Sequence, residues 1–313
     1  KLVVWHICSM NSLITSSVRR VMKLQQPILM RLRHPHQIRL LEPLLKYGLV
    51  LPKNCNAKDT HINERSAILL CNLRPDTTPR ILIYLHGGGY AVGSPHTHKG
   101  FAARLMQASC CERAYVPYYR LAPKYPYPTA LNDVFEFWQV LCDRYPDHEL
   151  VLAGESAGAG LCLALFQQIR SQQLRHPNKI FLHSPWLDVG LSGDSYHDLQ
   201  LNDGFLGRHP QRKAWLHRMF ARHYLGAGDA DDPLVSPIHM DVAQLPPIFV
   251  QVSTHEVFIA DSQRLIERCQ AQQIDCRLSV WPDLWHAFGL FAPWLPEANR
   301  AIHEAGEWIK TAR

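Results

Sequence analysis

Short apolar runs alternate with longer amphipathic stretches from Ser66 to the end of the chain. The runs have the character of buried β-strands and span residues 67–71, 81–85, 114–117, 150–153, 180–183, 248–252 and 277–280. Between them, stretches such as 97–110, 131–144 and 158–170 repeat apolar residues at helical spacing. Nearly continuous apolar strands that alternate with helices are typical of a mostly parallel sheet covered on both faces. The sequence therefore predicts an α/β fold.

Two regions do not fit this alternation. Residues 1–45 are rich in Leu, Met and Arg, and residues 191–225 contain an amphipathic piece, 210–223, with Trp215, Met219 and Phe220 on one face. We expect both regions to be helical and to pack together as a cap over the carboxyl ends of the strands, where the sites of α/β proteins lie. The main α/β domain then consists of residues 46–190 and 226–313.

The composition excludes several classes of protein. The 313 residues can hold one large α/β domain with an appendage. A net charge of +6, with no basic cluster interleaved with aromatic residues, argues against binding of nucleic acid. No apolar run is long enough to form a transmembrane segment. The nine cysteines are irregularly spaced and include no CxxC pair, which favours a reducing compartment, the cytoplasm. Met10 is an alternative start of the natural chain, with residues 1–9 as an upstream extension.

The pentapeptide Gly154-Glu155-Ser156-Ala157-Gly158 lies between an expected strand and an expected helix. A serine on a sharp turn between a strand and a helix is the context of a nucleophile elbow. Glycines flank such a serine because a Cβ would clash in so tight a bend. The pattern predicts that Ser156 attacks an acyl carbon. The alternative is a glycine-rich turn that opens a helix, and the glycine spacing does not fit a dinucleotide fingerprint.

A second motif, His86-Gly87-Gly88-Gly89, follows the expected strand 81–85. Consecutive glycines let backbone amides approach a ligand closely, and acyl transfer needs such donors for the developing oxyanion. We expect the amides of Gly87 and Gly88, together with that of Ala157, to form an oxyanion hole. The alternative is a flexible turn. His86 precedes the serine and is expected to shape the loop, since the order for this arrangement is Ser, acid, His.

The base is expected after the last strand, and His286 follows the strand that ends near Trp281. His303 competes with it but lies inside a terminal helical stretch, 298–310, so a surface position is expected. The acid should follow the strand 248–252, where Glu256 and Asp261 are candidates. Its carboxylate must accept a hydrogen bond from the histidine and hold its tautomer. Position favours Glu256, the candidate nearest the strand end; Asp283, on the same loop as His286, is a third candidate.

Taken together, these motifs resemble the hormone-sensitive lipase family of α/β-hydrolases, which includes bacterial esterases and arylacetamide deacetylases. The resemblance covers nearly everything from Ile81 to Phe288. Beyond the two glycine motifs, it rests on Tyr119-Arg120-Leu121-Ala122-Pro123, Tyr125-Pro126-Tyr127-Pro128, Ser184-Pro185-Trp186 and Asp232-Pro233-Leu234-Val235-Ser236-Pro237.

The resemblance implies an α/β-hydrolase fold whose catalytic domain holds a mostly parallel, eight-stranded sheet, with a helical cap. It implies a bacterial serine carboxylesterase that acts on small-molecule esters with short acyl chains, has no cofactor and no metal, and forms a homodimer. When the loop after residues 248–252 is aligned with the family's acid loop, Glu256 falls on the family's catalytic Asp and Asp261 on the last acidic position. Glu155 replaces the Asp that more usually precedes the family's nucleophile. We interpret the segment from Tyr119 to Pro128 as a rigid turn, with Arg120 paired to a buried carboxylate.

Three other functions are compatible with parts of this pattern. A lactonase or an amidase (deacetylase) would use the same three residues. A non-catalytic, ligand-binding member of the fold would be expected to lose the base, whereas His286 is in place. A metal-dependent hydrolase would have to use the histidine pairs His96 and His98 or His34 and His36. Because these pairs lack acidic neighbours in the sequence and lie outside the motifs, we interpret them as surface histidines.

Overall fold

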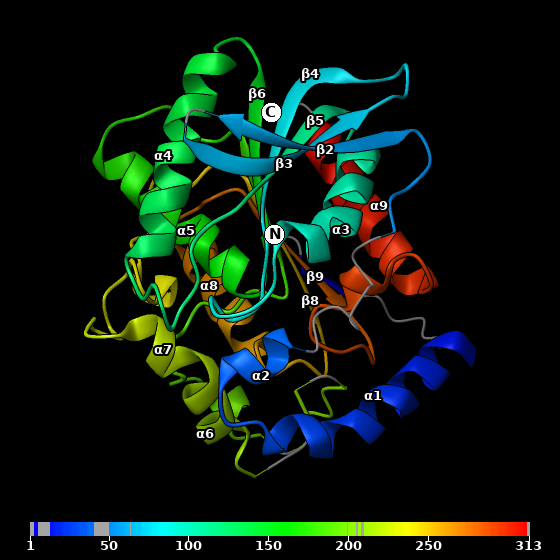
Figure 1. The fold of residues 1–313 in the computed structure, drawn as a ribbon, viewed down its shortest axis with the longest axis vertical. Coiled ribbons are helices and arrows are strands. Elements are labelled where there is room, and N and C mark those ends of the chain that lie inside the picture. Colours follow the sequence, from blue (N-terminus) through cyan, green and yellow to red (C-terminus); the bar gives the residue numbers. More distant parts are fainter. Residues whose placement is uncertain are drawn as a thin grey trace.

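The computed structural model describes residues 3–5, 13–40, 50–62, 64–198, 200–204, 206–207 and 210–311. Its strands form one sheet in the order β1-β9-β8-β7-β6-β4-β5-β3-β2 (Figure 1). The strands are β1 (Val3–Trp5), β2 (Cys55–Ile62), β3 (Arg65–Asn72), β4 (Thr78–Leu85), β5 (Cys111–Pro117), β6 (Glu149–Glu155), β7 (Lys179–His183), β8 (Ile248–Ser253) and β9 (Cys276–Trp281). From β1 to β5 every neighbouring pair is parallel, and only β3 and β2 run antiparallel to their neighbours.

The helices lie on both faces of this sheet and below it (Figure 1). They are α1 (Leu13–Arg31), α2 (Pro35–Arg39), α3 (Pro95–Ala108), α4 (Thr129–Arg144), α5 (Ala157–Ser171), α6 (Arg212–Leu216), α7 (Arg222–Leu225), α8 (Ile259–Ala271) and α9 (Pro296–Lys310). In Figure 1, α3 and α9 lie on one side and α4, α5 and α8 on the other. Each face has its own apolar core, one containing Phe101 and Ile302 and the other Trp138 and Leu161. None of the described helices combines the length and apolar character needed to cross a bilayer.

The seven strands expected from apolar runs are all present, as β3 to β9. With β2 they make the expected eight-stranded, mostly parallel sheet, and β1 adds a ninth strand beside β9. The sequence did not indicate β2, because this edge strand is mostly polar and exposes much of its length. This strand forms by pairing with β3, and its sequence lacks the apolar run that marks a buried strand.

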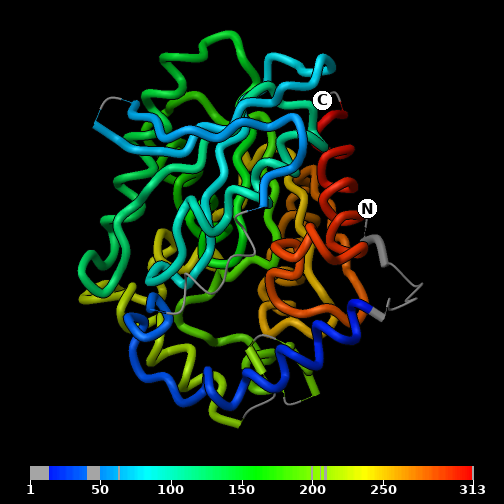
Figure 2. The backbone as a smooth tube through the Cα atoms, turned by 45° about the vertical axis from the view of Figure 1, so that its right-hand side comes forward, coloured from blue at the N-terminus to red at the C-terminus, as the bar shows by residue number. Residues whose placement is uncertain are grey.

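The two regions outside the alternation meet at one end of the molecule. Figures 1 and 2 both place α1 and α2 beside α6 and the residues that precede it, below the sheet. The indole Nε1 of Trp215 donates to the carbonyl of Leu29 at 3.1 Å, and Gln26 Nε2 donates to the carbonyl of Asp203 at 2.8 Å. Two hydrogen bonds thus join the segments, and their role as a cap stays a prediction.

One boundary of the expected cap differs from the structure. Residues 3–5 pair with β9 and so belong to the sheet, although the range 1–45 was expected to be helical. Their sequence, Val-Val-Trp, consists of β-branched and aromatic residues, which favour strands. Residues 6–12 and 41–45 of that range lie outside the described residues.

The expected ion pair of Arg120 is confirmed. Its guanidinium Nη2 lies 2.6 Å from Oδ1 of Asp133, a buried residue of α4, and its backbone amide donates to the same carboxylate at 2.9 Å. Arg65, at the start of β3, also contacts this carboxylate at 2.8 Å. The segment that follows Tyr119 is thus fixed to a helix that packs on the sheet.

Candidate active site

Ser156 occupies a strained turn between β6 and α5. Its backbone has φ 55° and ψ −124°, a conformation that side chains other than glycine rarely adopt. A Cβ at Gly154 would lie 2.5 Å from the carbonyl oxygen of Gly158, and a Cβ at Gly158 would lie 2.1 Å from that of Leu85. Both flanking positions therefore require glycine, and the expected elbow is present. The turn places the serine hydroxyl at the carboxyl end of the central strand.

A hydrogen-bonded chain connects Ser156 to His286 and Glu256. The serine Oγ lies 2.9 Å from Nε2 of His286, and Nδ1 of the same ring lies 3.2 Å from Oε2 of Glu256. All three side chains are buried. They follow β6, β9 and β8, respectively, so the parallel strands bring together residues that are far apart in the sequence.

The carboxylate of Glu256 is held by further hydrogen bonds. Its Oε1 accepts from the hydroxyl of Ser184 at 2.8 Å and from the backbone amide of Ser253, also at 2.8 Å. The hydroxyl of Ser184 in turn accepts from the amide of Ala287, the residue after His286, at 3.1 Å. One serine therefore links the loops that carry the acid and the base.

Burial and charge act in opposite directions on this pair. Burial is the largest influence on Glu256 and raises its pKa to about 7, although the hydrogen bond and charge of His286 and the hydrogen bond of Ser184 oppose that rise. For His286, burial lowers the pKa, but the hydrogen bond and the charge of Glu256 outweigh this and the pKa is raised. The charges of Glu155 and Asp203 add to the rise. The pair thus favours a proton on the imidazole once one is transferred to it.

The other candidate acids contact different partners. Asp261 is fully buried on α8, where its Oδ2 accepts hydrogen bonds from two backbone amides and from the hydroxyl of Tyr196. Asp283 Oδ1 lies 3.0 Å from Nε2 of His255. Of the three expected candidates, only Glu256 contacts His286.

The competing histidines lie elsewhere. His303 is 73% exposed on α9 and faces Glu307, in agreement with a surface position. His86 is buried and holds its own loop: its Nδ1 lies 2.8 Å from the carbonyl oxygen of Gly87, and its carbonyl accepts from the hydroxyl of Tyr119 at 2.6 Å. Burial and the nearby His98 lower the pKa of His86 to about 3. It therefore remains neutral and structural at ordinary pH.

The loop with Gly87 and Gly88 adjoins the serine turn. It follows β4, which pairs with β6 so that Leu85 stands opposite Gly154. Among the described residues, no backbone carbonyl accepts from the amides of Gly87, Gly88 or Ala157. The oxyanion hole expected from these three amides stays a prediction.

Glu155 places a second carboxylate next to His286. It is buried, and its Oε1 lies 3.9 Å from Nε2 of His286 while its Oε2 lies 3.3 Å from Nε2 of His98. Burial raises the pKa of Glu155, but the hydrogen bond and charge of His98, with the charges of His286 and His183, bring it below its usual value. An ionised Glu155 therefore faces the base from the side opposite Glu256.

This contact corrects the interpretation of one histidine pair. His98 is buried and has an acidic partner, Glu155, which the spacing along the chain did not reveal. His96 instead contacts the hydroxyl of Tyr118 at 2.7 Å. The remaining pair forms a local turn, in which Nδ1 of His34 accepts from the amide of His36 at 3.2 Å.

Two functional neighbours escaped the sequence analysis. Ser184 was noted only as part of a motif, although its place directly after β7 puts it at the carboxyl edge of the sheet. Asp203 lies in the expected cap region, and nothing in its local sequence indicates that it is buried. Its carboxylate accepts from the amide of His286 at 3.3 Å and from that of Val257 at 3.4 Å.

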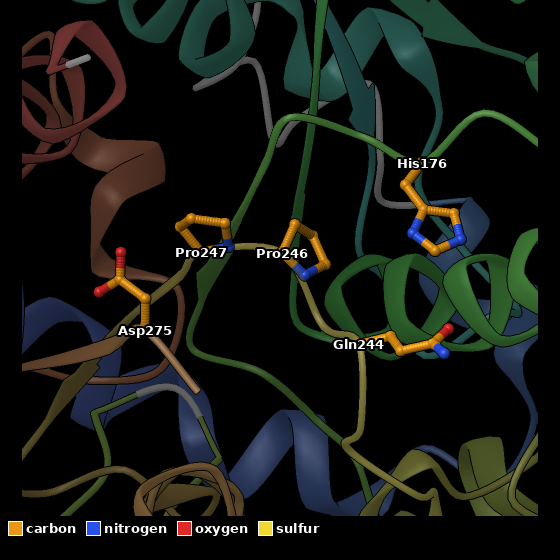
Figure 3. A pocket seen from close by; sticks show the side chains of 5 residues that line it. All are labelled: His176, Gln244, Pro246, Pro247 and Asp275. Carbon is orange, nitrogen blue, oxygen red and sulfur yellow. The ribbon is translucent and has the colours of Figure 1, made fainter. Parts of the chain in front are cut away.

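A cavity of about 480 Å³ lies away from these residues (Figure 3). It is lined by His176, Gln244, Pro246, Pro247 and Asp275. Several of them precede β7, β8 and β9, and so lie near the amino ends of these strands. The candidate site, at the carboxyl ends, is at the opposite edge of the sheet.

We predict that Ser184→Ala lowers kcat for ester hydrolysis by about 10- to 100-fold, because a lost hydrogen bond to a charged group is worth roughly 1.5–3 kcal/mol. The measurement is steady-state hydrolysis of p-nitrophenyl butyrate. Ser262→Ala is the matched control, since Ser262 is equally buried and its hydroxyl donates to the carbonyl of Phe258, the residue before α8, at 3.4 Å. Equal kcat values for the two variants would contradict the role of Ser184.

The chain is similar to known proteins over most of its length. The model of a family described as alpha/beta hydrolase fold matches residues 82–290. An acetyl-hydrolase of Streptomyces hygroscopicus is 35% identical over 234 residues, which cover 74% of this chain and 76% of that relative. An esterase of Acinetobacter venetianus is 30% identical over 231 residues, which cover 73% of this chain and 74% of the relative.

A solved structure extends the similarity to nearly the whole chain. The crystal structure of an esterase from the bacterial hormone-sensitive lipase family aligns with a TM-score of 0.86 and 28% identity, covering 96% of this chain and 99% of the other. The expected fold and enzyme class are confirmed. The chain therefore belongs to the hormone-sensitive lipase family of α/β-hydrolases and is a carboxylic ester hydrolase.

Proposed function

We propose that the protein is a serine carboxylesterase that hydrolyses esters with short acyl chains through an acyl-enzyme on Ser156. The observation that carries this proposal is the continuous chain of hydrogen bonds from Ser156 through His286 to Glu256. A nucleophile, a base within hydrogen-bonding distance and a carboxylate that orients the base are the three groups that acyl transfer by serine requires.

In the first step Ser156 Oγ forms a bond to the carbonyl carbon of the ester while its proton passes to Nε2 of His286. The carboxylate of Glu256 holds the proton on Nδ1, which leaves Nε2 free to accept, and stabilises the imidazolium that forms. The carbonyl π electrons move to oxygen and create the oxyanion. The 2.9 Å separation of Oγ and Nε2 already permits this transfer.

The oxyanion is placed against the amides of Gly87, Gly88 and Ala157. These donors belong to the β4 loop and to the first residue of α5, and their positions are fixed by the sheet. Donors held in place before the reaction need no reorganisation when charge develops, so they stabilise the transition state more than water would.

Collapse of this intermediate breaks the bond to the alcohol oxygen, which takes the proton from His286 as it leaves. Water then enters, and His286 removes its proton as the water oxygen attacks the acyl-enzyme. The second tetrahedral intermediate releases the carboxylic acid and returns the proton to Ser156 Oγ. No group beyond water and the ester is needed to balance the two steps.

A glutamate in place of the family's aspartate is compatible with this role. The extra methylene of Glu256 is accommodated because Oε1 is bound by Ser184 and Ser253 while Oε2 is left to His286. Both oxygens therefore have defined partners. A preference for short acyl chains is supported by a relative named as an acetyl-hydrolase.

Replacement of the nucleophile tests the proposal directly. We expect Ser156→Ala to lower the rate of p-nitrophenyl butyrate hydrolysis by about 10⁴-fold or more, since the covalent intermediate can no longer form. Circular dichroism should report an unchanged fold. Substantial activity in this variant would exclude Ser156 as the nucleophile.

A pair of isosteric substitutions tests the acid. Glu256→Gln removes the charge that raises the pKa of His286, so kcat should fall by about 10²–10⁴-fold. The base must be neutral to act, and activity is lost as the pH falls through its pKa. Lowering that pKa should therefore move the acid limb of the kcat/KM profile to lower pH. Asp261→Asn, the comparison variant, should leave this limb in place; the reverse result would transfer the role to Asp261.

The acyl-chain preference is tested with p-nitrophenyl esters of increasing chain length. We expect kcat/KM to be highest for the acetyl or butyryl ester and to fall by about tenfold or more toward the decanoyl ester, because poor fit of a longer chain costs transition-state binding. A maximum at long chains would retain the mechanism and reject the short-chain assignment.

A further inference from the structure

A carboxylate from the cap region lies directly behind the acid and the base. Asp203 is fully buried, in a segment that leads from β7 toward α6. Its Oδ1 accepts from the amide of His286 at 3.3 Å, and its Oδ2 accepts from the amide of Val257 at 3.4 Å. Val257 is the residue after Glu256. One carboxylate therefore binds the backbone of both loops whose side chains must meet.

We infer that Asp203 is a positioning residue, which fixes the acid and base loops relative to each other and makes the catalytic geometry depend on a docked cap. The inference rests on the proposed function and extends it to a residue outside the triad. Backbone contacts of this kind fix the positions of the Cα atoms of His286 and Glu256. A small shift of either loop would therefore lengthen the hydrogen bond between the two side chains.

The position of Asp203 is itself set by cap residues. Gln26 of α1 donates from Nε2 to the carbonyls of Asp203 and Gly204, both at 2.8 Å. Asp203 Oδ1 also accepts from the amide of Leu206 at 3.1 Å, which closes the local turn. Arg212 of α6 is buried and donates to the carbonyl of Ser195 at 2.9 Å in the same segment. A continuous set of contacts thus connects the first cap helix to the triad.

The charge of Asp203 acts on the base as well. Among the described residues, the ionisable groups that influence His286 include Glu256, Glu155, Asp203 and the neighbouring His183. The charge of Asp203 also reaches Arg212, where it partly offsets the fall in pKa that burial causes. Removal of the negative charge at Asp203 should therefore lower the pKa of His286, in addition to any change in geometry.

The test compares Asp203→Asn with Asp198→Asn on p-nitrophenyl acetate. Asp198 is exposed in the same segment and, like Asp203, its charge reaches Arg212. Among the described residues, its carboxylate accepts a hydrogen bond from the amide of Gln200 at 2.8 Å and none from the loops of His286 or Glu256. We expect Asp203→Asn to lower kcat by about 10- to 100-fold with little change in KM, as for other misplaced catalytic groups. The acid limb of its kcat/KM profile should move to lower pH. Asp198→Asn should behave as the unmodified protein.

Two further variants separate the possible failures. Gln26→Leu keeps the carboxylate of Asp203 but removes the hydrogen bonds from α1 to the backbone carbonyls of Asp203 and Gly204. A smaller fall in kcat is expected, and this variant decides the question if Asp203→Asn does not fold. Unchanged kcat and pH profile in both variants, or an effect on KM alone, would overturn the inference. Ser156→Ala, measured alongside, must be inactive: if it is active the proposed function fails, and if it is inactive only the role of Asp203 is in question.

Discussion

Parallel strand pairing is the constraint on which the rest of this structure depends. Because β4, β6, β7, β8 and β9 all run in one direction, the loops after them meet at a single edge of the sheet. The register places Leu85 opposite Gly154, and Glu155 opposite His183. Each loop then contributes one kind of group: backbone amides, a hydroxyl, a serine that links two loops, a carboxylate and an imidazole. Shifting one strand by two residues would separate these groups by more than a hydrogen bond can span.

The charges around the base follow from that convergence. Glu256 and Glu155 approach the two nitrogens of His286 from opposite sides, at 3.2 and 3.9 Å, and Asp203 lies behind its backbone. Burying several carboxylates is costly unless each is hydrogen-bonded or near a cation. Here His98 contacts Glu155, and Glu256 accepts hydrogen bonds from one hydroxyl and one backbone amide. The imidazolium formed during proton transfer would complete this balance, which links the cost of burial to the catalytic cycle.

The sequence predicted what depends on local pattern. The strands β3 to β9 were visible because buried strands are apolar on both faces, and Ser156, Glu256 and His286 could be located because each lies just after such a strand. The edge strand β2 was missed because one side of it faces solvent. Asp203 and the partnership of His98 with Glu155 were missed for another reason. These residues make contacts between segments that are far apart in the sequence. The helical spacing of α3 and the polar sequence of the cap loop do not specify which other segment each one contacts.

The contact between Trp215 and Leu29 has a consequence for the order in which the molecule can assemble. The bond joins residues 186 positions apart, and six of the nine strands, β2 to β7, lie between them in the sequence. Closing so long a loop in an unfolded chain is entropically expensive, whereas a formed sheet brings the two ends close without that cost. The cap is therefore expected to dock on a preformed sheet. If the proposed roles of His286 and Asp203 hold, enzymatic activity would then be among the last properties to return when the protein refolds.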